Sequence, residues 1–183
     1  MIYLPSDDSY LLVESLKKII PKIKNKSIKI LDMGSGSGIQ AQTCIDAGFN
    51  NILVSDIDKE VVNNLKDKGF NSVQSDLFSN IPIKDKFGLI IFNPPYLPKD
   101  KQEPKESRKA TTGGSRGDEI ILKFLKQAKF HLNENGKILL LLSSLTPKER
   151  IILLIKKLNL KYMQIASKKL FFEELYVWQI DNQ

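Results

Sequence analysis

The sequence predicts an open α/β sheet within a single domain, and three observations lead to this prediction. Aliphatic and β-branched runs alternate with helical patterns along most of the chain. Two of these runs, residues 87–93 and 136–144, are apolar on both faces, which is typical of parallel strands covered by helices on each side. The 183 residues, 42% of them hydrophobic, suffice for one sizeable core but not comfortably for two. We therefore expect one domain over 1–183.

The first expected element is an amphipathic helix, within an N-terminal helical segment over residues 1–26. Ser6 can cap this helix, and Asp7 and Asp8 would lie in its first turn, where negative charge is favourable. Its apolar face consists of Leu11, Leu12, Leu16, Ile19 and Ile20.

The remaining elements alternate along the chain. Strands are expected over 27–33, 51–56, 72–76, 87–93 and 136–144, and helices over 39–47, 58–68, 118–132 and 148–158. The last two runs, 161–170 and 175–180, are joined by a link too short for a helix, so they should form an antiparallel pair. Ligands of such a sheet bind at the carboxyl ends of its strands.

Composition excludes several kinds of protein. The single cysteine, Cys44, rules out an intrachain disulfide and a multi-cysteine metal site, and we expect a small buried helix residue rather than a nucleophile. This usage fits a reducing, cytoplasmic setting. The N-terminus has no signal-peptide pattern, and the longest apolar run, 138–145, is too short to span a membrane. The net charge of +7, gathered at 15–29 and 146–169, fits nucleic acid, an acidic protein or simple solubility.

A glycine-rich turn follows the first strand, in DMGSGSG. Glycines at 34, 36 and 38 would let the backbone approach a ligand closely, although such a turn can also be purely structural. The spacing fits a dinucleotide fingerprint poorly, because the third glycine of that motif would fall at Ile39. Asp32 adds negative charge, which disfavours a pyrophosphate and suits a ligand with a cationic end. The turn residues of interest are Gly34, Gly36 and Gly38.

The next two strands also end in aspartates. Asp56 can accept hydrogen bonds from the hydroxyls of a ribose; as a helix cap, Asp58 is the better candidate. Asp76 can accept from an exocyclic amine, and Leu77 can contact a base, although Asp76 also reads as an ordinary turn aspartate. One carboxylate for an ammonium, one for a ribose and one for an adenine describe S-adenosylmethionine better than a phosphate-bearing cofactor.

The fourth strand ends in Asn93-Pro94-Pro95-Tyr96. The Asn93 side-chain oxygen and the Pro94 carbonyl are acceptors, held in place because proline fixes φ. Together they could orient a planar –NH2 group for in-line methyl transfer and favour a transition state in which its nitrogen gains positive character. Tyr96 can pack on the planar group; a strand that merely ends in a proline turn is the alternative. His131 is not needed as a base and is expected at the surface or in a cap.

These motifs, with SDID and SDLF in the same order, resemble the HemK-type protein-(glutamine-N5) methyltransferases. YLPSDDSYLLVESL resembles that family's opening segment, in which an Asp-Ser or Asp-Thr pair, here Asp8-Ser9, lies near the cofactor, and GGSRGDEIILKFL resembles its Gly-Gly segment. The resemblance implies a class I S-adenosylmethionine-dependent fold with strand order 3-2-1-4-5-7-6, the seventh strand antiparallel. It implies that Asn93 to Tyr96 hold a glutamine amide. The cofactor would be contacted by Ser9, Asp32, Gly34, Asp56, Asp76, Leu77 and Asn93.

The chain is similar to the short archaeal and eukaryotic branch, whose substrate is a class I peptide release factor methylated in its Gly-Gly-Gln motif. Thr111 and Thr112 depart from the bulkier apolar residues of relatives, which leaves the grip on the substrate open. The segment 97–118 is expected to be a mobile substrate loop. Adenine in RNA or DNA is the alternative acceptor, because similar tetrapeptides serve adenine N6 methylation; a catalytically silent binding scaffold is another.

The resemblance also implies a partner. Members of this branch work with a small zinc-binding activator at the edge strand, here 72–76. The residues Ser72-Val73-Gln74 carry no proline and no charge, so nothing in the sequence protects that edge against pairing with another chain. We therefore expect an activator to pair there and to steady the loop that contains Asp76.

Overall fold

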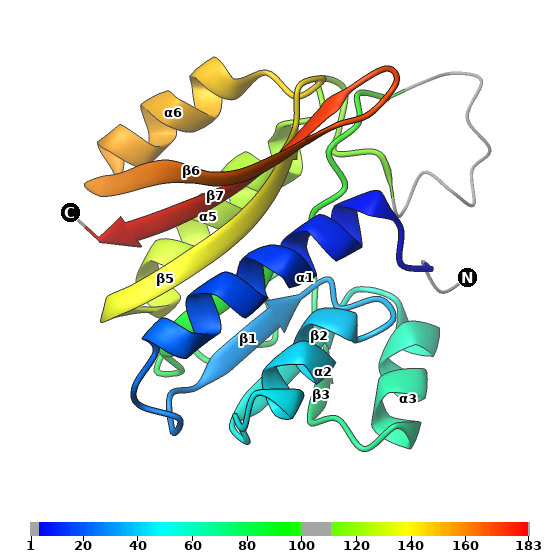
Figure 1. The fold of residues 1–183 in the computed structure, drawn as a ribbon, viewed down its shortest axis with the longest axis vertical. Coiled ribbons are helices and arrows are strands. Elements are labelled where there is room, and N and C mark those ends of the chain that lie inside the picture. The colour runs from blue at the N-terminus through cyan, green and yellow to red at the C-terminus, as the bar shows by residue number, and fades with distance from the viewer. Residues whose placement is uncertain (1–3, 100–110, 183) are drawn as a thin grey trace.

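The computed structural model describes residues 4–99 and 111–182 of the chain. In this part, seven strands form one sheet in the order β3-β2-β1-β4-β5-β7-β6, in which only β7 is antiparallel to its neighbours (Figure 1). The strands are β1 (Ile30–Met33), β2 (Ile52–Asp56), β3 (Ser72–Gln74), β4 (Phe87–Phe92), β5 (Leu132–Ser143), β6 (Leu160–Lys169) and β7 (Glu174–Asn182). The predicted fold class, strand order and antiparallel seventh strand are confirmed.

The helices lie close to their expected bounds. They are α1 (Asp7–Ile19), the 3-10 helix η1 (Ile20–Lys22), α2 (Ile39–Asp46), α3 (Lys59–Asp67), α5 (Glu119–His131) and α6 (Lys148–Lys157). None of the helices in the described ranges is long and apolar enough to cross a membrane. The predicted loop over 97–118 falls partly outside these ranges, since residues 100–110 are not described.

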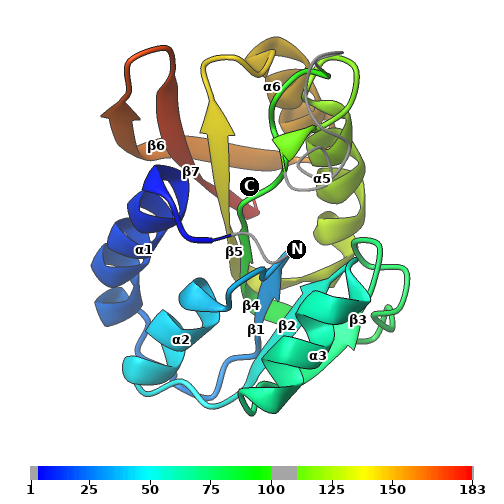
Figure 2. The same ribbon diagram turned by 90° about the vertical axis from the view of Figure 1, so that its right-hand side faces the viewer.

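Two apolar clusters pack against the sheet, one on each face. The helices α1, α2 and α3 cover one face over the first cluster, and α5 and α6 cover the other face over the second (Figure 2). In β4, Leu89 and Ile91 belong to the first cluster and Ile90 belongs to the second, because successive side chains of a strand point to opposite faces. Burial on both faces is why this strand is apolar at every position. Cys44 lies buried in the first cluster, and burial raises the pKa of its thiol to about 12, as expected for an inert core residue.

The sequence around His131 folds differently from the prediction. β5 begins at Leu132, directly after α5, where a turn was expected, and Leu132 pairs with Phe87 before a register shift in the ladder. His131 is buried, not at the surface: its ring stacks on Phe78 at 4.4 Å, and its Nδ1 lies 2.9 Å from the Asp85 carbonyl oxygen. An aromatic neighbour and a backbone partner make burial of the imidazole favourable.

The edge strand β3 is shorter than predicted and ends at Gln74. The Val54 N–H donates to the Asn71 carbonyl, and the Ser75 N–H donates to that of Asp56, so the odd-numbered residues bond to β2. Ser72 and Gln74 therefore present their backbone groups to the outer side. The sequence had suggested that nothing protects this edge. The structure shows partial protection, because the Asn80 side chain donates to the Gln74 carbonyl at 2.8 Å.

Candidate active site

The glycine-rich turn joins β1 to α2 at the carboxyl edge of the sheet. Gly34, Gly36 and Gly38 all have positive φ angles, of 61°, 52° and 83°. This backbone conformation is costly for residues with a Cβ. At Gly38 a Cβ would also come within 2.8 Å of Leu65. The three glycines are therefore needed for the shape of the turn, which brings backbone N–H groups to the sheet edge.

Asp32 is buried beneath this turn. One carboxylate oxygen accepts from the Ala41 N–H of α2 at 3.3 Å. Burial raises the pKa of Asp32 from 3.8 to about 7; the Ala41 hydrogen bond opposes the shift, and the charge of Asp56 adds to it. A buried carboxylate of this kind gains from a cation placed beside it, because the cation compensates for the lost hydration.

Asp56 is bonded to the same turn from the end of β2. Its two carboxylate oxygens accept from the Gly36 N–H at 3.1 Å and from the Asp58 N–H at 3.0 Å, and burial raises its pKa. Asp58 accepts from the Glu60 N–H at 2.9 Å and is the N-cap of α3, as predicted. The helix-capping alternative for Asp56 is thereby excluded, and its carboxylate retains lone pairs for further donors.

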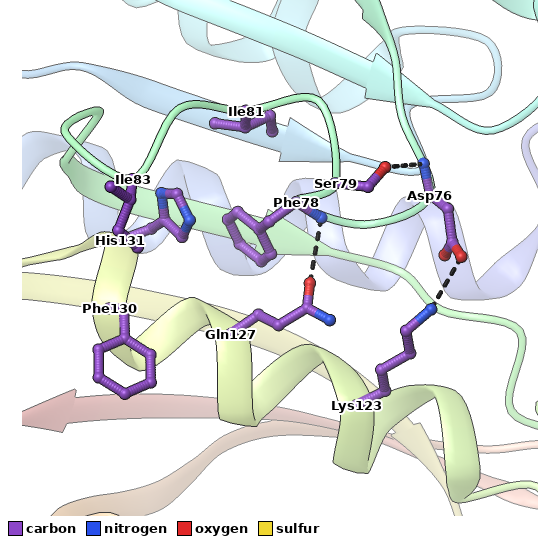
Figure 3. A pocket seen from close by; sticks show the side chains of 9 residues that line it. All are labelled: Asp76, Phe78, Ser79, Ile81, Ile83, Lys123, Gln127, Phe130 and His131. Atoms are coloured by element: carbon purple, nitrogen blue, oxygen red, sulfur yellow. Dashed lines mark hydrogen bonds and ion pairs between the residues drawn. The ribbon is translucent and has the colours of Figure 1, made fainter.

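Asp76 and Leu77 follow β3 in the chain, and Figure 3 shows Asp76 facing Lys123. The Asp76 carboxylate forms an ion pair with Lys123 of α5 at 2.8 Å. Both side chains are about half exposed, so the pair is weak and easily replaced. Leu77 has a positive φ of 52° and a largely buried side chain. No sequence pattern linked Asp76 to Lys123, which lies 47 residues further along the chain.

A cavity of about 380 Å³ lies between α5 and the segment after β3 (Figure 3). Of the predicted site residues, only Asp76 lines it. The remaining lining residues are Phe78, Ser79, Ile81, Ile83, Lys123, Gln127, Phe130 and His131. This cavity is therefore next to the strand-end site and does not coincide with it.

Asn93, at the end of β4, is hydrogen-bonded to the N-terminal helix. Its Nδ2 donates to Asp8 Oδ2 at 3.1 Å, and the other Asp8 oxygen accepts from the Ser9 N–H at 2.5 Å and the Ser9 hydroxyl at 3.1 Å. The Asn93 Oδ1 is buried and has no hydrogen-bond partner among the described residues. A carboxylate can only accept hydrogen bonds, so the amide nitrogen of Asn93 must face Asp8. The amide oxygen at the other end of the group is therefore the atom without a partner. The family resemblance implied that the Asp8-Ser9 pair lies near the cofactor, but nothing in the sequence linked Asp8 to Asn93.

Residues 111–117, which include the start of the Gly-Gly segment, bond to Leu97 directly after the Asn93–Tyr96 loop and pack closely against the loop backbone. The Leu97 N–H donates to the Thr111 carbonyl and the Gly113 N–H donates to the Leu97 carbonyl, both at 2.9 Å. A Cβ at Gly113 would lie 2.6 Å from the Pro95 oxygen, and one at Gly117 would lie 2.5 Å from the Tyr96 oxygen. Only glycine permits so close an approach between the two backbones, so the structure explains why residues 113 and 117 are glycines.

A third segment supports the same loop. The Thr146 hydroxyl, between β5 and α6, donates to the Tyr96 carbonyl at 3.0 Å. Pro94 is buried, and Pro95 and Tyr96 are partly buried, so the tetrapeptide is enclosed rather than an open turn. Within the described ranges, no group of three or more potential ligands could hold a metal ion. The site thus combines buried carboxylates, an orphaned amide oxygen and a rigid proline loop.

Comparison with known proteins places this site in a family context. Residues 7–172 match the family model described as Methyltransferase small domain. The chain is 35% identical to a Methanocaldococcus jannaschii protein that carries the provisional name protein N5-glutamine methyltransferase, over 96% of this chain and 89% of that one. It is 29% identical to the eRF1 methyltransferase catalytic subunit mtq2 of Schizosaccharomyces pombe, over 74% and 69% of the two chains.

Bacterial relatives and a solved structure extend the comparison. The chain is 33% identical to a release factor glutamine methyltransferase of Lactococcus lactis, but it spans only 52% of that protein's length. A chain in the structure of the E. cuniculi Mtq2-Trm112 complex superposes with a TM-score of 0.79 at 21% identity, covering 100% of this chain and 99% of the other. At that identity the likeness shows the fold.

Replacing Asp32 with Asn should stabilise the free protein near neutral pH. The folded pKa, about 7, lies above the ordinary 3.8, so ionisation costs stability as the pH rises from 3.8 to 7. Asn keeps an acceptor for the Ala41 N–H without the charge. Thermal unfolding at pH 8 should show a gain on the order of 1–3 kcal/mol, which shrinks as the pH approaches 4. An unchanged or lower melting temperature at pH 8 would contradict the assignment of Asp32 as a strained carboxylate.

Proposed function

Because the chain belongs to the methyltransferase small domain family, we propose that it methylates a glutamine side-chain nitrogen with S-adenosylmethionine as methyl donor. The acceptor is the glutamine of the Gly-Gly-Gln motif in a class I release factor. The observation that carries the proposal is the Asn93 amide, whose oxygen is buried without a partner while its nitrogen is held by Asp8. The names of the relatives from M. jannaschii and S. pombe favour the same substrate class.

The three strand-end carboxylates fit the cofactor by their chemistry. S-adenosylmethionine supplies an electrophilic methyl group on a positively charged sulfur. Asp32 provides negative charge near the glycine turn for the ammonium group, and Asp56 can accept from both ribose hydroxyls through lone pairs left free by Gly36 and Asp58. Gly34, Gly36 and Gly38 allow close approach of the backbone.

The adenine end would be held by residues after β3. Asp76 accepts from the exocyclic amine once the exposed Lys123 pair gives way, and Leu77 contacts the base. Ser9, whose hydroxyl already bonds to Asp8, joins the methionine end of the cofactor to the same network. These roles place the cofactor along the carboxyl ends of β1, β2 and β3.

The acceptor glutamine would be oriented by the loop after β4. Its amide N–H groups donate to Asn93 Oδ1 and to the Pro94 carbonyl, and Tyr96 packs on the amide plane. Delocalisation makes an amide nitrogen a weak nucleophile, so catalysis rests on holding it in line and on acceptors that strengthen their bonds as it becomes positive. The Gly-Gly segment and Thr146 keep these acceptors fixed, which lowers the reorganisation needed during the reaction.

The substrate can be tested with labelled S-adenosylmethionine and three acceptors. These are a class I release factor, the same factor with its Gly-Gly-Gln glutamine changed to Ala, and an adenine-rich nucleic acid. We expect label only in the unchanged factor. Asn93→Ala should lower turnover at least about a hundredfold, the scale of one missing preorganised partner.

Two controls separate catalysis from folding. Thermal unfolding of Asn93→Ala should remain cooperative, and its affinity for S-adenosylhomocysteine should change little compared with its turnover. Near wild-type turnover in this variant would refute the role of Asn93. Labelling of the adenine-rich nucleic acid instead of the factor would transfer the acceptor assignment to a base.

The ribose assignment predicts a ranking of cofactor affinities. Asp56→Ala should weaken S-adenosylmethionine binding by roughly 2 kcal/mol, through loss of charge-assisted hydrogen bonds. Asp76→Ala should cost less, because base contacts are partly apolar and the Asp76 carboxylate is half exposed. Asp58→Ala is the matched control, since it removes a neighbouring carboxylate that caps α3 and leaves the Asp56 carboxylate in place. Calorimetric titration measures all three, and unchanged affinity in Asp56→Ala would remove the ribose assignment.

We also propose that a small activator protein pairs with the exposed side of β3. The support is the strand's position at the sheet edge, its outward Ser72 and Gln74 backbone, and the solved Mtq2-Trm112 complex of a structurally similar chain. An added strand would steady the segment that begins at Asp76 and so raise cofactor affinity.

Two proline substitutions distinguish the faces of β3. Gln74→Pro removes a donor from the outer side, where proline is tolerated in an edge strand, so it should abolish activator binding and leave the fold intact. Val73→Pro removes a donor to β2 and should destabilise the fold itself. Gln74→Ala keeps the N–H and should bind normally. Co-purification with the activator and thermal unfolding report both properties, and normal binding by Gln74→Pro would exclude pairing at this edge.

A further inference from the structure

Two phenylalanines stand exposed at the turn between β6 and β7. Phe171 and Phe172 are 92% and 85% exposed, and their rings pack edge to face with centroids 4.6 Å apart. Turns usually carry small or polar residues, and adjacent exposed aromatic side chains are typical of interaction surfaces. The pair is not used by the cofactor or acceptor sites described above.

The turn that presents this pair is held in place by hydrogen bonds. The Leu170 N–H donates to the Glu173 carbonyl at 2.8 Å, and the Ser143 hydroxyl donates to the Glu173 carboxylate at 2.5 Å. Glu174 exchanges two further bonds with Ser144, of 2.8 and 2.9 Å. A surface that is already ordered loses less conformational entropy on binding, which suits it to contact a partner.

The turn lies at the same edge of the sheet as the acceptor loop (Figures 1 and 2). β7 is antiparallel to β5, so its first residues pair with the carboxyl end of β5, with Leu175 opposite Ser143. The same β5–α6 connection supplies Thr146, which bonds to the Tyr96 carbonyl. The hairpin is also linked to the N-terminal helix, because Lys168 of β6 forms an ion pair at 2.9 Å with Asp7, the neighbour of Asp8.

We propose that Phe171 and Phe172 form a docking platform for the folded body of the protein substrate, outside the tripeptide that enters the catalytic loop. This proposal rests on the function proposed above. The occupant follows from position: a protein whose glutamine reaches Asn93 must also cover the rim of the catalytic edge, where the turn stands. Lys168 and Lys169 flank the pair on one side and Glu173 and Glu174 on the other, so the turn has none of the net positive charge that a nucleic-acid site needs.

The test compares a whole substrate with a fragment of it. The double variant Phe171→Ser/Phe172→Ser and the wild type are assayed on the intact release factor and on a short peptide that contains its Gly-Gly-Gln motif. We expect KM for the intact factor to rise at least about tenfold in the variant, with kcat nearly unchanged, as for the loss of two central aromatic contacts. Neither the peptide's kinetic constants nor cofactor affinity should change.

Phe130→Ser is the matched control. Phe130 is also an exposed phenylalanine, 61% accessible, but it lies at the C-terminal end of α5, away from the catalytic loop. This variant should show wild-type KM for both substrates. A similar rise in KM for Phe130→Ser would mean that any exposed aromatic residue has the effect, and the platform would be refuted.

The other outcomes decide between the two proposals. If the wild type methylates factor and peptide but the double variant keeps its KM for the factor, the platform alone is wrong. If the double variant loses activity on both substrates equally, the turn supports the catalytic loop and is not a platform. If the wild type labels adenine-rich nucleic acid and neither factor nor peptide, the proposed function fails, and the platform fails with it.

Discussion

The hydrogen bond between Asn93 and Asp8 is the contact on which the acceptor site depends. It joins residues 85 positions apart, one at the end of β4 and one in the first turn of α1. Asp8 can only accept hydrogen bonds, so the nitrogen end of the Asn93 amide must point toward it. The apolar side of α1 is buried against the sheet, and this keeps the Asp8 carboxylate in place. The orientation of the Asn93 amide is therefore set before the substrate nitrogen arrives, which lowers the ordering cost of binding it.

Around this contact the site is built from groups that the free fold does not fully satisfy. Burial raises the pKa values of Asp32 and Asp56, and the Asn93 oxygen has no partner among the described residues. Each group costs stability in the empty protein and gains from a ligand of the right kind: a cation for Asp32, hydroxyl donors for Asp56, an N–H for Asn93. These groups, which lower the stability of the empty protein, therefore mark the places where a bound ligand would stabilise it, which is typical of functional sites.

Local patterns in the sequence predicted much of the fold. Periodicity placed the strands and helices within a few residues, and Asp56 and Asn93 could be proposed as site residues because parallel strands bring their carboxyl ends together. Contacts between distant segments left no local pattern. The Asp8 bond to Asn93, the Lys123 ion pair of Asp76 and the burial of His131 all depend on tertiary packing. Gly113 and Gly117 approach the backbone of the acceptor loop closely, but a glycine in the sequence does not show which segment it will contact.

The site lies where the order of the strands reverses, since β1 has β2 on one side and β4 on the other. Charge divides at the same point. The ends of β1, β2 and β3 carry Asp32, Asp56 and Asp76, whereas the end of β4 carries a neutral amide. Under the proposed function this division has a reason. A carboxylate in place of Asn93 would add a further negative charge near Asp32 and Asp56, whose pKa values burial already raises. The neutral amide oxygen supplies a fixed acceptor for the substrate nitrogen without that cost.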